Sequence, residues 1–356
     1  VELLKVMFDL KQNPDPIEPP AQPWSPEPPS SAMRRLIEAM RERTAAPIRS
    51  TMEVSRELVR DPDISAARTR TIAAGVRHLG ELATRRIAST PWNSGIVGQR
   101  RALASTSMSF GEFRAIRNAF GGSINDVVLT ILTEGAARYL RHHGYKTGSQ
   151  LCVGCPVNVR HKEEASTLGN RVSMMFPRLA AEPMDPVERL RQVAAETEQI
   201  KAAQLPQALE ALMSLGDNIP PGLIGMGSRL GTTALDAASA LFRLSGYKPR
   251  PDRFLLPTVG INFVATNVPG VQVPQYLFGH KCLEQIPLVP LGATLGFGVA
   301  ILSYNQTLNF GMIADPNLMP DVSLMKFFVD ETFGELKNRC QEQAEESARA
   351  AAAGGA

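Results

Sequence analysis

The chain has 356 residues, of which 44% are hydrophobic and 21% are charged, as is typical of a globular protein whose core needs no disulfide scaffold. The net charge of +3 is small for this length, so the overall charge gives no sign of nucleic-acid binding. No run of about eighteen consecutive apolar residues occurs, which excludes a transmembrane helix.

The N-terminal region reads as a linker followed by helices. Residues 13–30 are rich in proline, which predicts an extended polyproline linker, and residues 31–60 and 65–89 predict two helices. Only residues 1–12 precede the linker, so we expect a missing N-terminal partner region, either cut away or a separate chain. The region from Arg34 to Arg117 is rich in arginine. We interpret these arginines as lying on solvated helix faces rather than contacting anionic lipid.

The next segments predict a strand and two helices. Residues 104–109 are strand-like, and residues 110–120 predict a helix that ends at two glycines. Ser123 and Asp126 then have the spacing of a capping box, in which each side chain bonds the other residue's backbone N–H. The helix that they start is expected to end at His142 and His143, before Gly144.

Two strands and a helix are predicted to follow. Residues 151–159 and 171–179 predict strands, and Asp185 starts a helix that reaches about Gln204. Residues 205–247 read as short core-facing helices, with an acyl-chain channel or membrane-facing patch as the alternative.

The four cysteines predict neither a metal site nor a redox site. Cys152 and Cys155 form a C-x-x-C on a predicted strand, whereas zinc needs a second close pair and a redox motif needs a helix at the first cysteine. We interpret all four as reduced, mostly buried thiols, consistent with a cytosolic compartment.

The stretch from Ile261 to Gly270 predicts a buried strand that ends abruptly in a tight turn. Its end offers the Thr266 hydroxyl, the Asn267 amide and free backbone N–H groups; a simple turn is the alternative reading. Residues 296–304 and 306–314 predict a hairpin, residues 321–340 a last helix, and residues 344–356 a fraying tail.

Several short motifs, in this order along the chain, resemble the bacterial wax ester synthase/acyl-CoA:diacylglycerol acyltransferase family. The resemblance covers roughly Ser105 to Leu336, the family's C-terminal half. The matching stretches are Asn125-Asp126-Val-Val-Leu, Pro156-Val-Asn-Val-Arg160, Gly169-Asn170-Arg-Val-Ser173, Thr266-Asn267-Val-Pro-Gly270, Ser303-Tyr304 and Phe310-Gly311.

The resemblance implies an α/β fold of the chloramphenicol-acetyltransferase type, with two lobes and a mixed sheet flanked by helices. This chain would be mainly the C-terminal lobe. We expect residues 1–30 to be the end of the N-terminal lobe and the linker, 31–104 a helical connection, 105–343 the C-terminal acyltransferase lobe and 344–356 a disordered tail.

The implied activity is O-acyl transfer from acyl-CoA, a substrate, to a lipid alcohol, which makes wax esters or triacylglycerol without a cofactor. The family's H-H-x-x-x-D-G histidine would act as general base, and here it would come from the N-terminal lobe, as the same gene product or a separate chain. His142 and His143 nearly match that signature, but Thr147 replaces the aspartate, and helix termination explains the pair. The alternative is a non-catalytic lobe that binds lipid or a partner.

The resemblance also implies roles for residues of this chain. Asn125 and Asp126 would lie near the active site, and Thr266 and Asn267 are candidates for oxyanion or substrate hydrogen bonds. The expected substrate-binding residues are Arg160, Asn170, Gly270, Ser303 and Tyr304, although Arg160 fits an ion pair with a buried carboxylate better than a CoA phosphate. We expect a cytoplasmic protein, with peripheral contact on the inner face of the plasma membrane left open.

Overall fold

The computed structural model describes residues 7–14, 25, 31, 87–158, 172–203 and 260–354. Most of the predicted linker, the two helices predicted within residues 31–89, and the predicted helices of residues 205–247 lie outside the described residues. Arg160 and Asn170 lie outside them too.

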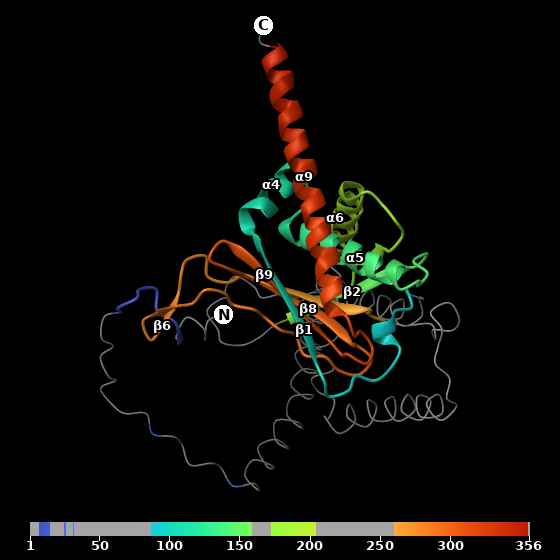
Figure 1. Cartoon of the computed structure of the whole chain (residues 1–356), viewed down its shortest axis with the longest axis vertical. Helices are drawn as coiled ribbons and strands as arrows, with labels where there is room; N and C mark the ends of the chain where they lie inside the picture. Colours follow the sequence, from blue (N-terminus) through green and yellow to red (C-terminus); the bar gives the residue numbers. More distant parts are fainter. Residues whose placement is uncertain are drawn as a thin grey trace, which may run out of the picture.

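A mixed sheet with helices packed on one face forms the body of the protein (Figure 1). Its strand order is β1-β9-β8-β5-β2-β3, with β4 also paired to β2. β2, β5 and β8 run parallel, and the remaining pairs are antiparallel. The strands are β1 (Ala102–Ser109), β2 (Gln150–Asn158), β3 (Val172–Met175), β4 (Arg178–Ala180), β5 (Phe263–Val268), β8 (Phe297–Tyr304) and β9 (Thr307–Ala314).

Helix α5 is the centre of the helical layer. The helices are α4 (Phe110–Phe120), α5 (Ile124–His142), α6 (Pro186–Ala202) and α9 (Val322–Gly354), and a 3-10 turn, η1, spans Pro91–Asn93. α5 packs against α6 and α9 and is buried along most of its length, including the polar residues Asp126, Thr130 and Glu134. A Cβ at Gly135 would lie 2.7 Å from a Val329 methyl, so glycine lets α5 and α9 approach closely.

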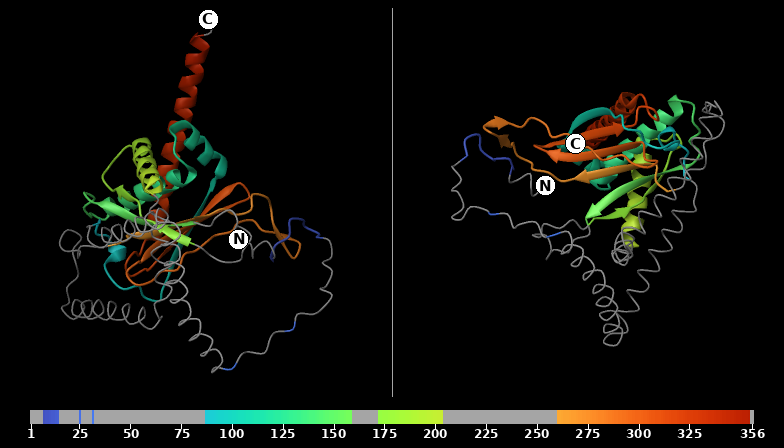
Figure 2. Two further views of the ribbon diagram at one scale, coloured as in Figure 1. Left: turned by 180° about the vertical axis from the view of Figure 1, so that it is seen from behind. Right: turned by 90° about the horizontal axis from the view of Figure 1, so that it is seen from below.

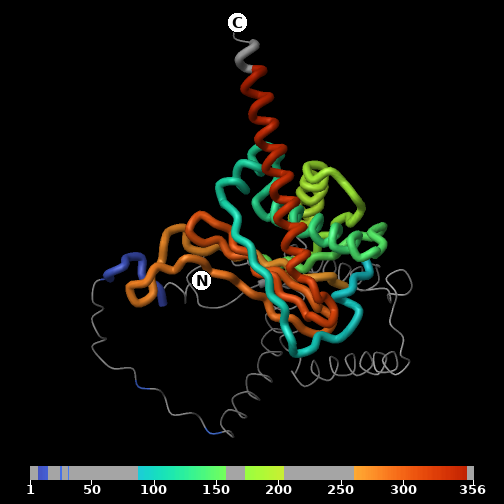
Figure 3. Tube along the Cα trace, viewed as in Figure 1, coloured from blue at the N-terminus to red at the C-terminus, as the bar shows by residue number. Residues whose placement is uncertain are grey.

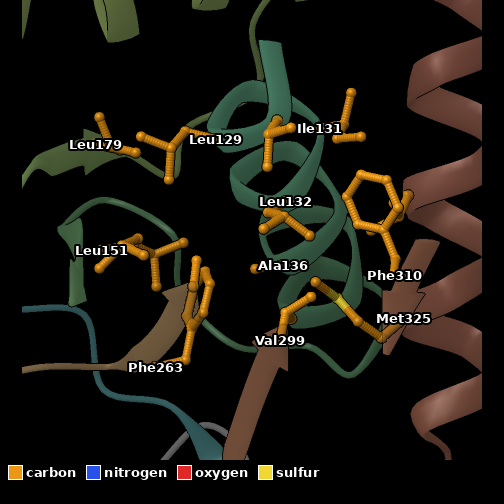
Figure 4. Close-up of a cluster of buried hydrophobic side chains, with 14 of the residues drawn as sticks. Leu129, Ile131, Leu132, Ala136, Leu151, Leu179, Phe263, Val299, Phe310 and Met325 are labelled. Carbon is orange, nitrogen blue, oxygen red and sulfur yellow. The ribbon is translucent and has the colours of Figure 1, made fainter. Parts of the chain in front are cut away.

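The main core lies between α5 and the sheet (Figure 4). Leu132 and Ala136 of α5 point toward Phe263 and Val299 on the sheet, and Met325 of α9 closes the far side. Fully burying each large side chain contributes about 1.5–3 kcal/mol. Every residue of β8 is buried, so this strand reads as a continuous apolar run rather than an alternating one.

An extended segment, residues 285–292, crosses the sheet face opposite the helices. Gly298 and Gly311 alternate with the core residues of β8 and β9, and a Cβ at either would clash with Val289 or Pro287. Exposure alternates strictly along the segment, and the outward side chains include Ile286 and Leu288, 48% and 51% exposed. The segment is therefore apolar on both of its faces.

A short hairpin precedes that segment at one side of the sheet. It consists of β6 (Tyr276–Leu277) and β7 (His280–Lys281), and Asp9 bonds Tyr276 in both directions at 2.8 Å. Figures 2 and 3 show residues 7–14 beside this hairpin, away from the helices. Phe278 at the hairpin tip is 90% exposed.

Among the described residues, the predicted elements agree with the structure except at three places. The single strand expected at residues 171–179 is divided into β3 and β4, which pair with successive parts of β2 on either side of Phe176-Pro177. The β6–β7 hairpin was not predicted. α9 continues to Gly354 rather than ending near Cys340, because alanine, glutamate and arginine favour helix and Glu345 pairs with Arg349 one turn on.

Candidate functional site

The candidate site lies where the parallel strands β2, β5 and β8 end and α5 begins. Ligands of open α/β sheets commonly bind outside the carboxyl ends of parallel strands. The capping box is present as predicted: the Ser123 hydroxyl accepts from the Asp126 N–H, and the Asp126 carboxylate accepts from the Ser123 N–H. The first turn of α5 therefore has a fixed conformation beside the carboxyl ends of these strands.

Asn125 and Asn267 form a hydrogen-bonded pair beside the carboxyl ends of these strands. The Asn267 side chain donates from Nδ2 to Asn125 Oδ1 at 2.6 Å, although 142 positions separate the two residues. Each amide has two N–H groups, so the pair keeps three N–H groups and the Asn267 oxygen for a ligand. Asn125 is exposed and Asn267 half-buried, and both line one small hollow.

The hollow has apolar walls below the amide pair. The residues that line it with Asn125 and Asn267 come from α5 and four strands: Val128, Leu129, Cys155, Pro156, Val157, Met175, Ala265 and Ile301. Its volume is about 30 Å³, roughly the share of one water molecule in the liquid. These residues form one wall of a site and cannot by themselves enclose a fatty acyl chain.

Asp126 turns away from this hollow. Its carboxylate is 3% exposed and accepts hydrogen bonds from the Ser123 backbone, the Ser123 hydroxyl and the Thr197 hydroxyl of α6, each at 2.7 Å. The structure thus separates the two adjacent residues that sequence analysis assigned to the site. Asn125 faces the hollow, and Asp126 ties α5 to α6.

Thr266 and Gly270 lie on either side of Asn267. By strand alternation Thr266 faces the opposite side of the sheet from Asn267, next to Ala300. The Gly270 N–H donates to Ser303 Oγ at 3.0 Å, and the turn passes so close to the Ser303 carbonyl that a Cβ at Gly270 would clash with it. Glycine is therefore required where the turn crosses the end of β8.

Ser303 and Tyr304 hold loops in place. Ser303 Oγ also accepts from Gln272 Nε2 at 2.8 Å. The Tyr304 hydroxyl donates to the Cys282 carbonyl and accepts from the Gln275 N–H, and burial raises the pKa of this phenol. Both residues are buried, so their contacts in this structure are with the chain itself.

His142 and His143 lie at the other end of α5. His143 Nε2 is 2.9 Å from the Asp321 carboxylate, which also accepts from the Tyr139 hydroxyl, and the His142 ring contacts Phe328. At 1.5 Å per residue, the length of α5 separates Asn125 from His143 by roughly 27 Å. A general base must come within about 3 Å of its proton or reach it through one water, so these histidines cannot serve the amide pair.

Cys152 and Cys155 lie on β2, and burial outweighs the opposing effect of Arg178 on the Cys152 thiol. Burial raises the pKa of Cys155, and it raises that of Cys152 to about 11. Among the described residues, no group of histidine, cysteine, aspartate and glutamate could hold a metal ion. The described helices include none long and apolar enough to cross a membrane.

A larger hollow, about 240 Å³, lies at the opposite end of β2 between β4 and α6. Its walls include Gln150, Arg178, Gln192 and Glu196 and none of the predicted site residues. We place the candidate site at the smaller hollow because the amide pair and the helix N-terminus meet there.

Sequence reasoning selected Asn125 and Asn267 but missed two features of the site. The apolar lining is indistinguishable in sequence from ordinary core. Thr197 lies mid-helix, 71 positions from Asp126, with no motif around it.

Comparison with known proteins gives matches along most of the chain. Residues 1–128 match the model of the wax ester synthase/diacylglycerol acyltransferase catalytic domain, and residues 168–337 match the WS/DGAT C-terminal domain. A Mycobacterium tuberculosis protein named diacylglycerol O-acyltransferase Rv1760 is 28% identical over 65% of this chain and 42% of its own length. Another, tgs1 of the same organism, is 27% identical over 68% of this chain and 48% of its own length.

A solved structure shares the fold. The wax ester synthase/diacylglycerol acyltransferase from Marinobacter aquaeolei VT8 aligns with a TM-score of 0.51 and 20% identity, covering 79% of this chain and 58% of that chain. This confirms the predicted α/β fold with a mixed sheet flanked by helices. The chain spans about half the length of the curated relatives it matches.

Proposed function

Because this chain belongs to the wax ester synthase/diacylglycerol acyltransferase family, we propose that it takes part in acyl transfer from acyl-CoA to the hydroxyl of a lipid alcohol. The product would be a triacylglycerol when the acceptor is diacylglycerol and a wax ester when it is a fatty alcohol. The observation that supports this proposal most is the Asn125–Asn267 pair above an apolar hollow.

In the proposed reaction the alcohol oxygen attacks the thioester carbonyl and its proton passes to a histidine. The carbonyl oxygen becomes an oxyanion, which then collapses and expels CoA thiolate. Free N–H groups of the amide pair, beside the positive end of the α5 dipole, are suited to stabilise that oxyanion. The apolar lining is suited to the first carbons of the acyl chain.

The general base is proposed to come from outside the described residues, from a region carrying H-H-x-x-x-D-G in the same gene product or in a separate chain. Support comes from the length of the relatives, of which this chain covers about half. Further support comes from the exposed apolar side chains of Phe278, Leu283, Ile286 and Leu288, a surface suited to packing against another lobe. Because the proposed acceptor is a lipid, the proposal includes peripheral contact of the protein with a membrane.

A direct test compares two protein samples, this chain alone and this chain with the N-terminal half of a curated relative. Labelled palmitoyl-CoA is supplied with either diacylglycerol or hexadecanol, and the esters are separated and counted. Ester formation in the second sample, lost when the first two histidines of H-H-x-x-x-D-G are changed to alanine, is the expected result.

The alternative is a lobe that keeps the fold and binds lipid or a partner without catalysis. The absence of histidine from the residues lining the described hollow favours it. Absence of ester in both samples, together with binding of acyl-CoA, would replace the enzymatic proposal with this one. Sequencing upstream of the Val1 codon gives an independent test, since an H-H-x-x-x-D-G in frame supports the enzyme.

A further inference from the structure

We propose that Thr197 of α6 is a positioning residue for the Asn125–Asn267 amide pair, acting through the carboxylate of Asp126. This inference rests on the proposed function for its catalytic consequence, but its structural part can be tested separately. It gives a role in acyl transfer to a side chain that has no contact with the hollow.

The contact between Thr197 and Asp126 is short and enclosed. Thr197 Oγ1 donates to Asp126 Oδ1 at 2.7 Å, and the two residues are 1% and 3% exposed. The other carboxylate oxygen, Oδ2, is taken by the Ser123 N–H and hydroxyl. Thr197 is thus the donor that reaches Asp126 from outside its own helix.

A purely local role does not account for this hydroxyl. A threonine within a helix commonly bonds a carbonyl one turn back, and Thr197 Oγ1 also lies 3.1 Å from the Ala194 carbonyl. Its distance to the carboxylate is shorter, as expected when the acceptor is charged. The bond across the two helices is therefore the stronger of the two.

The restraint on the Asp126 side chain reaches the site through the backbone of α5. Asp126 follows Asn125 directly in the first turn of α5, so fixing the Asp126 side chain fixes the backbone from which the Asn125 amide projects. Gly122, just before this turn, leaves so little room that a Cβ there would lie 3.3 Å from both the Ala194 methyl and Asp126 Oδ2. α6 therefore sets where α5 begins.

α6 remains attached without this bond. The Arg189 guanidinium of α6 pairs with Glu134 of α5 at 2.7 Å, with both side chains 2% exposed, and Asp185 caps the start of α6. Removing the Thr197 hydroxyl should therefore loosen the first turn of α5 without detaching α6. A role of the Thr197 hydroxyl in positioning Asn125 can therefore be tested separately from a role in packing α6 against α5.

The test compares Thr197→Val, which removes the hydroxyl and keeps the shape, with Thr197→Ser, which keeps the hydroxyl. Thr332→Val is the matched control, because Thr332 of α9 is equally buried and its hydroxyl bonds only the Phe328 carbonyl among the contacts described. In the active enzyme, Thr197→Val should lower kcat about tenfold with KM for acyl-CoA nearly unchanged, since small displacements of a catalytic group are costly. Thr197→Ser and Thr332→Val should keep kcat.

A double-mutant cycle asks whether the effect passes through Asn125. In an Asn125→Ala background the loss caused by Thr197→Val should disappear, because the group that it positions is gone. Equal losses in both backgrounds would overturn the proposal, as would a kcat loss of the same size in Thr332→Val.

A second readout does not depend on activity. With ¹⁵N-labelled asparagine, the Asn267 side-chain amide signal, identified by its loss in Asn267→Ala, should shift or broaden in Thr197→Val and stay in place in Thr197→Ser and Thr332→Val. An unchanged signal in Thr197→Val would refute the positioning role even if the enzyme is active. A shifted signal in a protein without acyl transfer would support the positioning and refute the proposed function.

Discussion

The two ends of α5 each carry a pair of adjacent polar residues, and the pairs differ in an instructive way. At the start of the helix, Asn125 faces a hollow and bonds Asn267, while Asp126 is buried against α6. At its end, His143 pairs with Asp321 and His142 packs on Phe328. The histidines are the more reactive residue type, and they lie at the end of α5 away from the carboxyl ends of the parallel strands β2, β5 and β8.

The comparison indicates that position in the sheet matters more here than residue chemistry. The start of α5 lies beside the carboxyl ends of three parallel strands, and α5 and these strands line the hollow. The end of α5 is covered by the beginning of α9. Substitutions at three places, Asn125, Asp126 and the two histidines, test this difference, from the largest expected effect to the smallest.

Replacing Asn125 by alanine should lower kcat by about 100-fold to 1,000-fold, as expected for loss of an oxyanion donor. The melting temperature should change little, because Asn125 is exposed. Asn118→Ala on α4 is a matched control, since Asn118 is an exposed helical asparagine that bonds only Arg117 among the described contacts. Wild-type rates in Asn125→Ala would show that the start of α5 contributes no more to catalysis than its end.

Replacing Asp126 by alanine should lower the free energy of unfolding by about 1–3 kcal/mol, because it leaves the half-buried Ser123 N–H without its acceptor and removes the bond to the buried Thr197 hydroxyl. Asp126→Asn should cost about 1 kcal/mol, since an amide oxygen can still accept one of these bonds. In both variants kcat should fall further than the stability loss predicts, through displacement of Asn125. Chemical denaturation alongside steady-state rates measures the two effects, and a stability loss with unchanged kcat would reduce Asp126 to a helix cap.

Replacing His142 and His143 together by glutamine should leave turnover within a few-fold of wild type. The stability loss should be about 0.3–1 kcal/mol, from the lost interaction of any protonated imidazole with the helix C-terminus and with partly exposed Asp321. A thousandfold loss of activity would show that this end of α5 takes part in catalysis, contrary to the comparison.

The pH dependence of stability gives a separate test, at Cys152 on β2, outside both ends of α5. Burial raises its pKa to about 11, whereas a thiol in the unfolded chain ionises near ~8.5. Between these values the folded state binds more protons, so the free energy of unfolding falls as the pH rises through this window and is unaffected by Cys152 below it. Urea denaturation from pH 8 to 10.5 should show this decline, and Cys152→Ala should make it less steep, leaving the part due to buried Cys155; an equal decline in both proteins would mean that Cys152 does not contribute.

Local features of the fold were predictable from the sequence, whereas contacts between distant segments were not. The capping box of Ser123 and Asp126 involves residues three apart, and the β8–β9 hairpin needs only a short turn, so a local pattern predicts each. The division of β3 from β4 depends on how both pair with β2. Pro177 marks the break locally, but no local pattern encodes which part of β2 each strand pairs with.

The same distinction applies within the candidate site. The motifs identified Asn125 and Asn267 separately, but only the fold brings their amides to 2.6 Å. Sequence reasoning grouped Asp126 with Asn125 because they are adjacent, and a helical turn points adjacent side chains in different directions. The strand period likewise turns Thr266 away from Asn267.

The position of β1 at one edge of the sheet has a consequence for biosynthesis. β1 pairs only with β9 among the described strands, and 202 positions separate Ser107 from its partner Asn309. At a translation rate of about 5–20 residues per second, β1 waits roughly 10–40 s on the ribosome before its partner is made. During that time it is an unpaired strand able to join another nascent chain. Slowing or truncating synthesis before Thr307 should therefore favour aggregation, and chaperones that shield extended segments should raise the yield of folded protein.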